Sequence, residues 1–252
     1  MELHYRQLGQ GAPLVLIHGL FGSGDNWLGV APRLAERFHV FAPDLRNHGH
    51  SPHATFMDYP GLAADVAKFM ARCGLARAGI IGHSLGGKVA MQLAMDHPGL
   101  VEKLVVVDMA PRAYQPVHIP ILEALAQLPI HELKTRQDAE AALAGAIPSL
   151  NLRRFLLKNL TRNEQGNFVW RMNLAGLADN YLRLGEALAA GPSFPGPTLF
   201  IRGGKSEYIT AADEPGIKSR FPAASLQTIP TANHWVHADA PAAFLDLILA
   251  YL

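Results

Sequence analysis

A five-residue motif, Gly82-His83-Ser84-Leu85-Gly86, constrains this chain more than any other feature. It reads G-x-S-x-G and stands between an apolar run at residues 78–81 and a segment with apolar residues at helical spacing. A serine that projects from a strand end needs a sharp turn, and side chains two positions away on either side would collide with neighbouring backbone. Glycine at both positions removes that collision. The motif therefore predicts a strand, a tight turn and a helix, with Ser84 as candidate nucleophile; a Gly-rich turn with a capping serine is the alternative.

Short apolar runs alternate with longer helical patterns, which is typical of βαβ units and a mainly parallel sheet. The candidate strands are residues 14–17, 39–42, 78–81, 104–107, 198–201 and 225–229, with 5–8 as a weaker edge strand. Helical patterns occupy residues 59–74 and the segment that begins near Pro241. The expected fold class is therefore α/β, with helices flanking the sheet.

The alternation stops after Asp108. From Pro111 to about Pro195 we predict no strands, but helices near residues 121–128, 152–160 and 175–190. An insertion of this size between two strands indicates a helical cap over the strand ends. The expected division is a core at residues 1–110 and 197–252, with the cap at residues 111–196.

Charge and cysteine content exclude several classes of protein. Lysine plus arginine numbers 22 and aspartate plus glutamate 21, so the net charge of +1 indicates no nucleic-acid partner. The single cysteine, Cys73, excludes an intramolecular disulfide. The sequence begins without the basic and apolar segments of a secretory signal and shows no stretch long enough to span a membrane. We therefore expect a cytoplasmic protein without a membrane partner; the oligomeric state is left open.

In open α/β sheets, reacting groups gather at the carboxyl ends of the strands. The turn after the first long strand is His18-Gly19-Leu20-Phe21-Gly22, and its backbone can present an N–H group toward Ser84. With the N–H of Leu85, the N–H of Leu20 would form an oxyanion hole, and Phe21 is the fallback donor. Such a pair stabilises negative charge that develops on a substrate oxygen.

The loop at residues 44–51 follows the next strand, and we interpret it as structural, braced by Arg46. His48, His50 and His53 raise the possibility of a metal site. Acidic ligands do not stand at matching spacings, so the histidines are expected on a solvated loop and no metal is predicted.

A loop near the C-terminus, Ala232-Asn233-His234-Trp235-Val236-His237, carries the candidate base. The base must accept the proton of Ser84 and pass it on, and His234 follows the last strand as that role requires. His237 is the alternative, although its place closer to the following helix favours a neighbouring position.

These motifs together resemble a known family. The chain is similar to α/β-hydrolase fold serine esterases with a helical cap, and more narrowly to the bacterial YbfF-type esterases and their mitochondrial abhydrolase relatives. The segments that carry the resemblance are HGLFGSGDNW at residues 18–27, DLRNHGHSP at 44–52, GHSLGGK at 82–88, VDMAP at 107–111, WRMN at 170–173, FIRGGKSEY at 200–208 and ANHWVHA at 232–238.

The resemblance also bears on the acid that orients the histidine. In the commonest arrangement of the fold, the acid stands three residues past a glycine after the penultimate strand, which here is Ser206. A serine cannot be that acid. In the YbfF-type group the carboxylate comes from the end of the preceding strand, which implies Asp108; Glu207 is the alternative and Asp213 a remote one. Ser206 is expected as a supporting residue, as are His83 and Trp235, which adjoin Ser84 and His234 in the sequence.

The predicted activity is hydrolysis of short- to medium-chain esters or thioesters through an acyl-enzyme on Ser84, without metal or organic cofactor. The resemblance allows acyl-CoA as a small-molecule substrate. Lys88, Arg153 and Arg154 are candidates to meet its phosphates, with solvated surface charges as the alternative explanation. Carbon–carbon bond hydrolysis, perhydrolysis and acyl transfer use the same serine and remain alternatives, as does a non-catalytic binding module.

Overall fold

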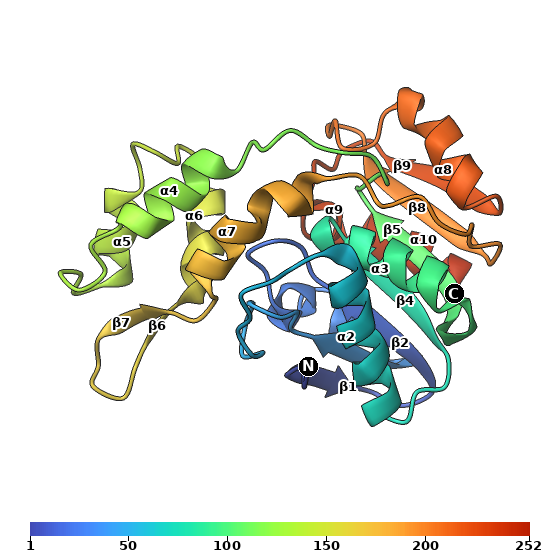
Figure 1. The fold of residues 1–252 in the computed structure, drawn as a ribbon, viewed down its shortest axis with the longest axis horizontal. Helices are drawn as coiled ribbons and strands as arrows, with labels where there is room; N and C mark the ends of the chain where they lie inside the picture. The colour runs from blue at the N-terminus through green and yellow to red at the C-terminus, as the bar shows by residue number, and fades with distance from the viewer.

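A twisted seven-stranded sheet forms the centre of the protein. A computed structural model describes all residues, 1–252, and its ribbon is shown in Figure 1. The strand order is β1-β3-β2-β4-β5-β8-β9, and only the β1–β3 pair is antiparallel. The strands are β1 (Tyr5–Leu8), β2 (Ala12–Ile17), β3 (Phe38–Pro43), β4 (Ala78–His83), β5 (Val101–Val107), β8 (Thr198–Gly203) and β9 (Ala224–Ile229). The predicted α/β class with a mainly parallel sheet is confirmed, and each predicted strand is found.

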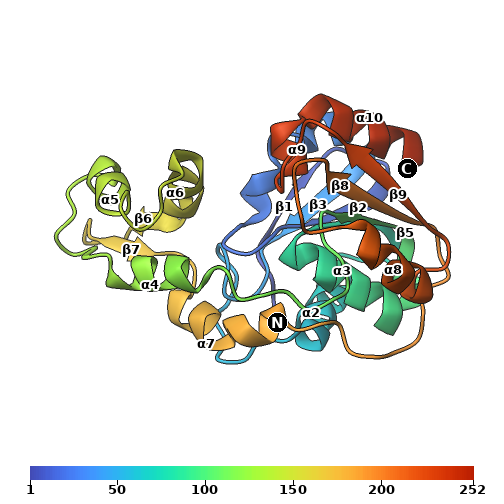
Figure 2. The ribbon, with the colours of Figure 1, turned by 90° about the horizontal axis from the view of Figure 1, so that it is seen from above.

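Helices cover both faces of the sheet, as Figure 2 shows from above. One layer contains α2 (Tyr59–Arg72), α3 (Leu85–Asp96) and α8 (Glu214–Arg220), and the other contains α1 (Ala31–Leu34), α9 (Val236–Asp239) and α10 (Pro241–Tyr251). Alternation along the strands explains the two layers: Val15 and Ile17 pack toward α3, whereas Leu14 and Leu16 pack toward α10. None of the helices combines the length and the apolar character needed to cross a membrane. Short 3-10 turns lie at Gly24–Trp27, Pro98–Leu100, Leu157–Asn159 and Ala211–Asp213.

The chain between β5 and β8 leaves the sheet and forms the cap, at the left of Figures 1 and 2. The cap contains α4 (Ile119–Gln127), α5 (Arg136–Ala142), α6 (Leu150–Leu156) and α7 (Leu174–Gly185). The apolar cluster beneath α2 and α3 continues into it through Leu125, Leu156 and Leu177, all fully buried. The cap and this layer of the core therefore share one apolar interior.

The prediction that the insertion lacks strands is wrong. An antiparallel hairpin pairs β6 (Leu160–Arg162) with β7 (Phe168–Trp170). It ends the predicted 152–160 helix early, since α6 stops at Leu156 and a 3-10 turn leads into β6. Thr161 before the turn and Phe168-Val169-Trp170 after it favour strands, and Gly166 at φ 81° permits the tight turn between them.

Candidate active site

Ser84 occupies the turn between β4 and α3. Its backbone has φ 54° and ψ −119°, a region that non-glycine residues adopt only under constraint. The chain approaches itself very closely on both sides of it. A Cβ on Gly82 would lie 2.1 Å from the carbonyl oxygen of Gly86, and a Cβ on Gly86 would lie 2.3 Å from that of Ile17. The two glycines thus permit the turn that lifts Ser84 above the sheet.

This close packing gives a test of the turn. We expect Gly86→Ala to lower the free energy of unfolding by about 1–3 kcal/mol or more, because the added methyl group overlaps carbonyl oxygens that cannot move independently. Gly99→Ala is the matched control, since its Cβ would meet nothing within 4 Å. Urea unfolding of both variants provides the measurement. Equal stability of the two would contradict the packing of the turn.

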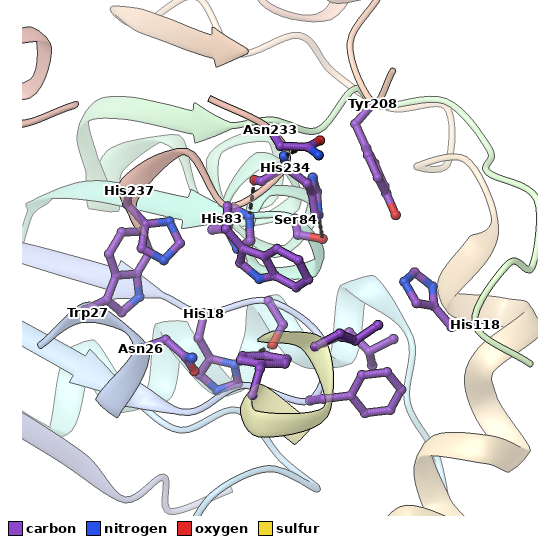
Figure 3. A pocket seen from close by; sticks show the side chains of 16 residues that line it. His18, Asn26, Trp27, His83, Ser84, His118, Tyr208, Asn233, His234 and His237 are labelled. Carbon is purple, nitrogen blue, oxygen red and sulfur yellow. Dashed lines mark hydrogen bonds between the residues drawn. The ribbon is translucent and has the colours of Figure 1, made fainter. Parts of the chain in front are cut away.

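Three side chains from distant parts of the sequence, Ser84, His234 and Asp108, form a hydrogen-bonded chain at the sheet edge, and Figure 3 shows the first two of them. His234 lies in the loop after β9, with Nε2 3.0 Å from the Oγ of Ser84 and Nδ1 2.8 Å from Oδ2 of Asp108. Asp108 follows β5 directly, with φ 50°, and is fully buried. Such an arrangement can move a proton from the serine to the histidine while a carboxylate faces the ring's other nitrogen.

The carboxylate of Asp108 accepts two further hydrogen bonds. Gly203 donates its N–H to Oδ1 at 3.0 Å, and Ser206 donates its hydroxyl to Oδ2. The two alternative acids lie elsewhere. Glu207 is exposed, and Asp213 pairs with Arg112 at 2.7 Å and with the Thr210 cap. Of the three predicted acids, the structure therefore brings only Asp108 to His234.

Other groups hold the His234 loop. His83 donates from Nε2 to the carbonyl oxygen of His234 at 2.9 Å, and Tyr208 stacks on the imidazole with ring centres 3.8 Å apart. Trp235 packs against Phe155 of the cap. His237 points away and packs on Trp27, with ring centres 4.5 Å apart. Burial lowers the pKa of His237 to about 3. Tyr208 enters the sequence analysis only as the end of the segment at residues 200–208, without a predicted role.

The backbone N–H groups of Leu20 and Leu85 are the predicted oxyanion donors. Neither the N–H of Leu20 nor that of Leu85 donates a hydrogen bond within the protein. Leu85 is the first residue of α3, so its N–H is one of the free donors at a helix N-terminus. Phe21, the fallback donor, gives its N–H to Nε2 of His48 at 3.2 Å. Of the two alternatives, Leu20 is thus the one whose N–H is available.

Two cavities meet at Ser84. The aromatic cavity, of about 220 Å³, is lined by Trp27, Phe155, His234 and Trp235 among others, and is drawn in Figure 3. The tyrosine cavity, of about 280 Å³, is lined by Tyr59, Tyr114, Tyr181 and Leu184 among others. Both cavities also include Leu20, Ser84, His118 and Tyr208. A ligand with two arms could therefore place its junction at Ser84.

The loop at residues 44–51 differs from the expectation. Arg46 does brace it, through Asp65 at 2.6 Å and two backbone carbonyls. The loop is not uniformly solvated, however, because His48 is fully buried. His50 and His53 are exposed, as expected, and they contact the guanidinium and the carbonyl of Arg171 in the cap.

The three cations considered for phosphate binding lie in different surroundings. Lys88 is 1% exposed, so a solvated surface charge is the wrong description. It donates to the carbonyl of Glu186 and lies about 5 Å from two tyrosine rings. Burial, aided by Arg112, lowers the pKa of Lys88 to about 7. Arg153 donates to two backbone carbonyls, and Arg154 pairs with Glu140 at 2.9 Å. Lys88 thus lines the cavity of Tyr59 and Tyr114 described above, whereas Arg154 is an exposed charge, as the alternative explanation expected.

Comparison with known proteins gives consistent matches. Residues 12–241 match the family described as alpha/beta hydrolase fold. The chain is 38% identical over 257 residues to the sn-1-specific diacylglycerol lipase of Danio rerio, covering 97% of this chain and 79% of that protein. It is 37% identical over 243 residues to Esterase YbfF of Escherichia coli (strain K12), covering 96% and 93%. A solved structure named Marine microorganism esterase superimposes with a TM-score of 0.98 and 41% identity, covering 100% of this chain and 99% of that one.

Proposed function

The chain belongs to the alpha/beta hydrolase fold family, as its resemblance to the YbfF-type esterases predicts, and we propose that it hydrolyses esters or thioesters through an acyl-enzyme on Ser84. The relatives compared above are named esterases and a lipase, which supports action on ester bonds. The observation that carries the mechanism is the continuous hydrogen-bonded chain from Ser84 through His234 to Asp108.

The first half of the reaction forms the acyl-enzyme. Ser84 Oγ attacks the carbonyl carbon while His234 Nε2 takes the hydroxyl proton. The bond from that carbon to the alcohol oxygen, or to the thiol sulfur, then breaks, and His234 gives the proton to the departing atom. In the second half, His234 takes a proton from water, the resulting hydroxide attacks the acyl carbon, and Ser84 regains its proton as the carboxylic acid leaves.

Two backbone groups suit the negative charge that develops on the carbonyl oxygen. The N–H groups of Leu20 and Leu85 are free of intramolecular acceptors, and the second adds the partial positive charge of a helix N-terminus. Asp108 holds the Nδ1–H tautomer of His234 and stabilises the imidazolium, while Ser206 and Gly203 hold the carboxylate in place.

The position of His234 distinguishes the roles of the two cavities. The departing atom must lie near His234 Nε2 to receive its proton, and His234 lines the aromatic cavity but not the tyrosine cavity. The alcohol or thiol portion therefore belongs in the aromatic cavity and the acyl chain in the tyrosine cavity. At about 280 Å³, the acyl cavity falls slightly below the roughly 300–1,000 Å³ of drug-sized pockets, which favours short to medium chains.

A panel of substrates tests the activity. Nitrophenyl esters and acyl-CoA thioesters of two to sixteen carbons should be hydrolysed with a maximum at short or medium length, about tenfold or more above the longest chain. Mass spectrometry of the intact protein after fluorophosphonate treatment should show one adduct, on Ser84. Absence of hydrolysis of every ester and thioester would refute the proposed function.

Enlarging the acyl cavity should shift the chain-length preference. Leu184 lines the tyrosine cavity and is 6% exposed. Leu184→Ala should therefore raise kcat/KM for longer acyl chains relative to acetyl by about tenfold, because the space gained lets one or two further methylene groups of the chain make apolar contacts. Leu182→Ala is the matched control on the same helix, since Leu182 is 66% exposed. An unchanged ratio in Leu184→Ala would place the acyl chain elsewhere.

A further inference from the structure

The turn that carries the Leu20 N–H is held from two sides. Phe21 adopts φ 61°, and Gly22 donates its N–H to the carbonyl of Gly19 at 3.0 Å, which closes the turn. A left-handed Phe21 is unfavourable by itself, so its neighbours must hold the turn in this shape. Both polar groups of the Phe21 backbone are bonded to buried side chains, one from the core and one from the cap.

The core side chain is His48. Its Nδ1 lies 3.0 Å from the carbonyl of Arg46 and therefore carries the proton, so Nε2 is left to accept the Phe21 N–H at 3.2 Å. The ring must be neutral to do this. Its full burial and the nearby His18 lower the pKa of His48 to about 3, so the acceptor persists at neutral pH.

The cap side chain is Asn159, at the end of the 3-10 turn after α6. Its Nδ2 donates to the carbonyl of Phe21 at 2.8 Å and to that of Leu156 at 3.2 Å. Asn159 is 3% exposed, although its neighbour Lys158 is exposed. Burying an amide without hydrogen-bond partners costs free energy, so the two bonds that the side chain of Asn159 makes hold it in this position between the cap and the core.

The same two sides are joined a second time. The backbone carbonyl of Asn159 accepts the N–H of Arg171 at 2.8 Å. Two residues after Arg171, Asn173 donates twice to Asn47: its backbone N–H to the carbonyl at 2.9 Å, and its side-chain Nδ2 to Oδ1 at 3.0 Å. Asn47 directly precedes His48. These hydrogen bonds and the short chain segments between them form a closed ring. It runs from Phe21 to His48 and Asn47 in the core, then to the cap, and returns through Asn159 to Phe21.

We infer that Asn159 is a positioning residue, through which correct seating of the cap on the core holds the Phe21 backbone and thereby aims the Leu20 N–H at the oxyanion. This inference rests on the proposed acyl-enzyme chemistry. A loss of Asn159 should leave binding of the ground-state substrate intact, because the side chain lines neither cavity. It should weaken only the interaction that forms when the carbonyl oxygen becomes negatively charged.

The experiment compares two variants with their controls on the full chain. Asn159→Ala should lower kcat by about 10- to 100-fold with KM within about twofold, as small displacements of positioned groups do. The inhibition constant of a trifluoromethyl ketone, which adds to Ser84 Oγ and leaves an oxyanion, should rise by a similar factor. Asn151→Ala, an exposed asparagine of α6 without a side-chain hydrogen bond, should behave as wild type.

Two variants of His48 test the same inference independently of Asn159→Ala. His48→Leu should reproduce the kcat loss and the weaker inhibition, whereas His48→Gln, which returns an acceptor oxygen near the position of Nε2, should recover part of both. If folded Asn159→Ala keeps kcat and inhibitor affinity within twofold of wild type, or if Asn159→Ala is unfolded and His48→Leu keeps them, the inference is wrong. Fluorophosphonate labelling separates the two proposals: a wild-type protein that is not labelled at Ser84 refutes the acyl-enzyme itself.

Discussion

Ser84→Ala is expected to lose about 10,000-fold or more in turnover, because the nucleophile and its base act as a unit and little catalysis remains without either. The hydroxyl is the group hydrogen-bonded to His234, at 3.0 Å, and the variant keeps every other contact of the turn. Steady-state hydrolysis of a nitrophenyl ester measures the loss. The variant should fold normally, since alanine is smaller and accepts the same constrained backbone no worse than serine.

His234→Ala should show a loss of similar size, and the double variant should be no slower than either single one. Non-additivity of this kind is the signature of groups that share one step. Fluorophosphonate should give one adduct on wild type and none on Ser84→Ala. Labelling of a different serine, or full additivity of the two losses, would show that Ser84 and His234 do not work together.

The features that the sequence predicted best are those with local causes. The role of Ser84 could be predicted because Gly82 and Gly86, the glycines that the turn requires, stand within two residues of it and can be read directly from the sequence. The strands could be placed because buried strands are short apolar runs. Since parallel strands end at one sheet edge, the loops after β2, β5 and β9 were expected to converge, which is how His234 and Asp108 entered the prediction.

The missed features depend on partners far away in the sequence. His48 and Asn159 stand 27 and 138 residues from Phe21, and nothing in their neighbours indicates that both bond to one backbone unit. Lys88 occupies a helix position that suits a solvated cation, but the rings of Tyr59 and Tyr114 and the carbonyl of Glu186, all distant in the sequence, surround its ammonium group. The hairpin β6–β7 has only three residues in each strand, too short for a pattern of period two to stand out.

Asp108→Asn is expected to lose about 10,000-fold in turnover, since an amide of the same shape lets the histidine take the wrong tautomer. The amide would also change the acceptors available to the two other groups that donate hydrogen bonds to Asp108. Gly203 N–H and the Ser206 hydroxyl both donate to Asp108, and an asparagine can accept at only one of its two terminal atoms. The variant's stability must therefore be measured beside its activity, by urea unfolding, so that a loss of folded protein is not read as a loss of catalysis.

Two variants complete this test of the acid. Glu207→Gln should stay within about tenfold of wild type, because the carboxylate is exposed and makes no hydrogen bond to the histidine loop. Ser206→Ala removes one hydrogen bond to Asp108, worth about 1 kcal/mol, and so should lose a factor of about ten at most. Both variants should therefore remain far more active than Asp108→Asn. If folded Asp108→Asn kept near-normal turnover while Glu207→Gln collapsed, His234 would have to leave Asp108 and turn toward the loop after β8 during the reaction, and the acid would belong to that loop.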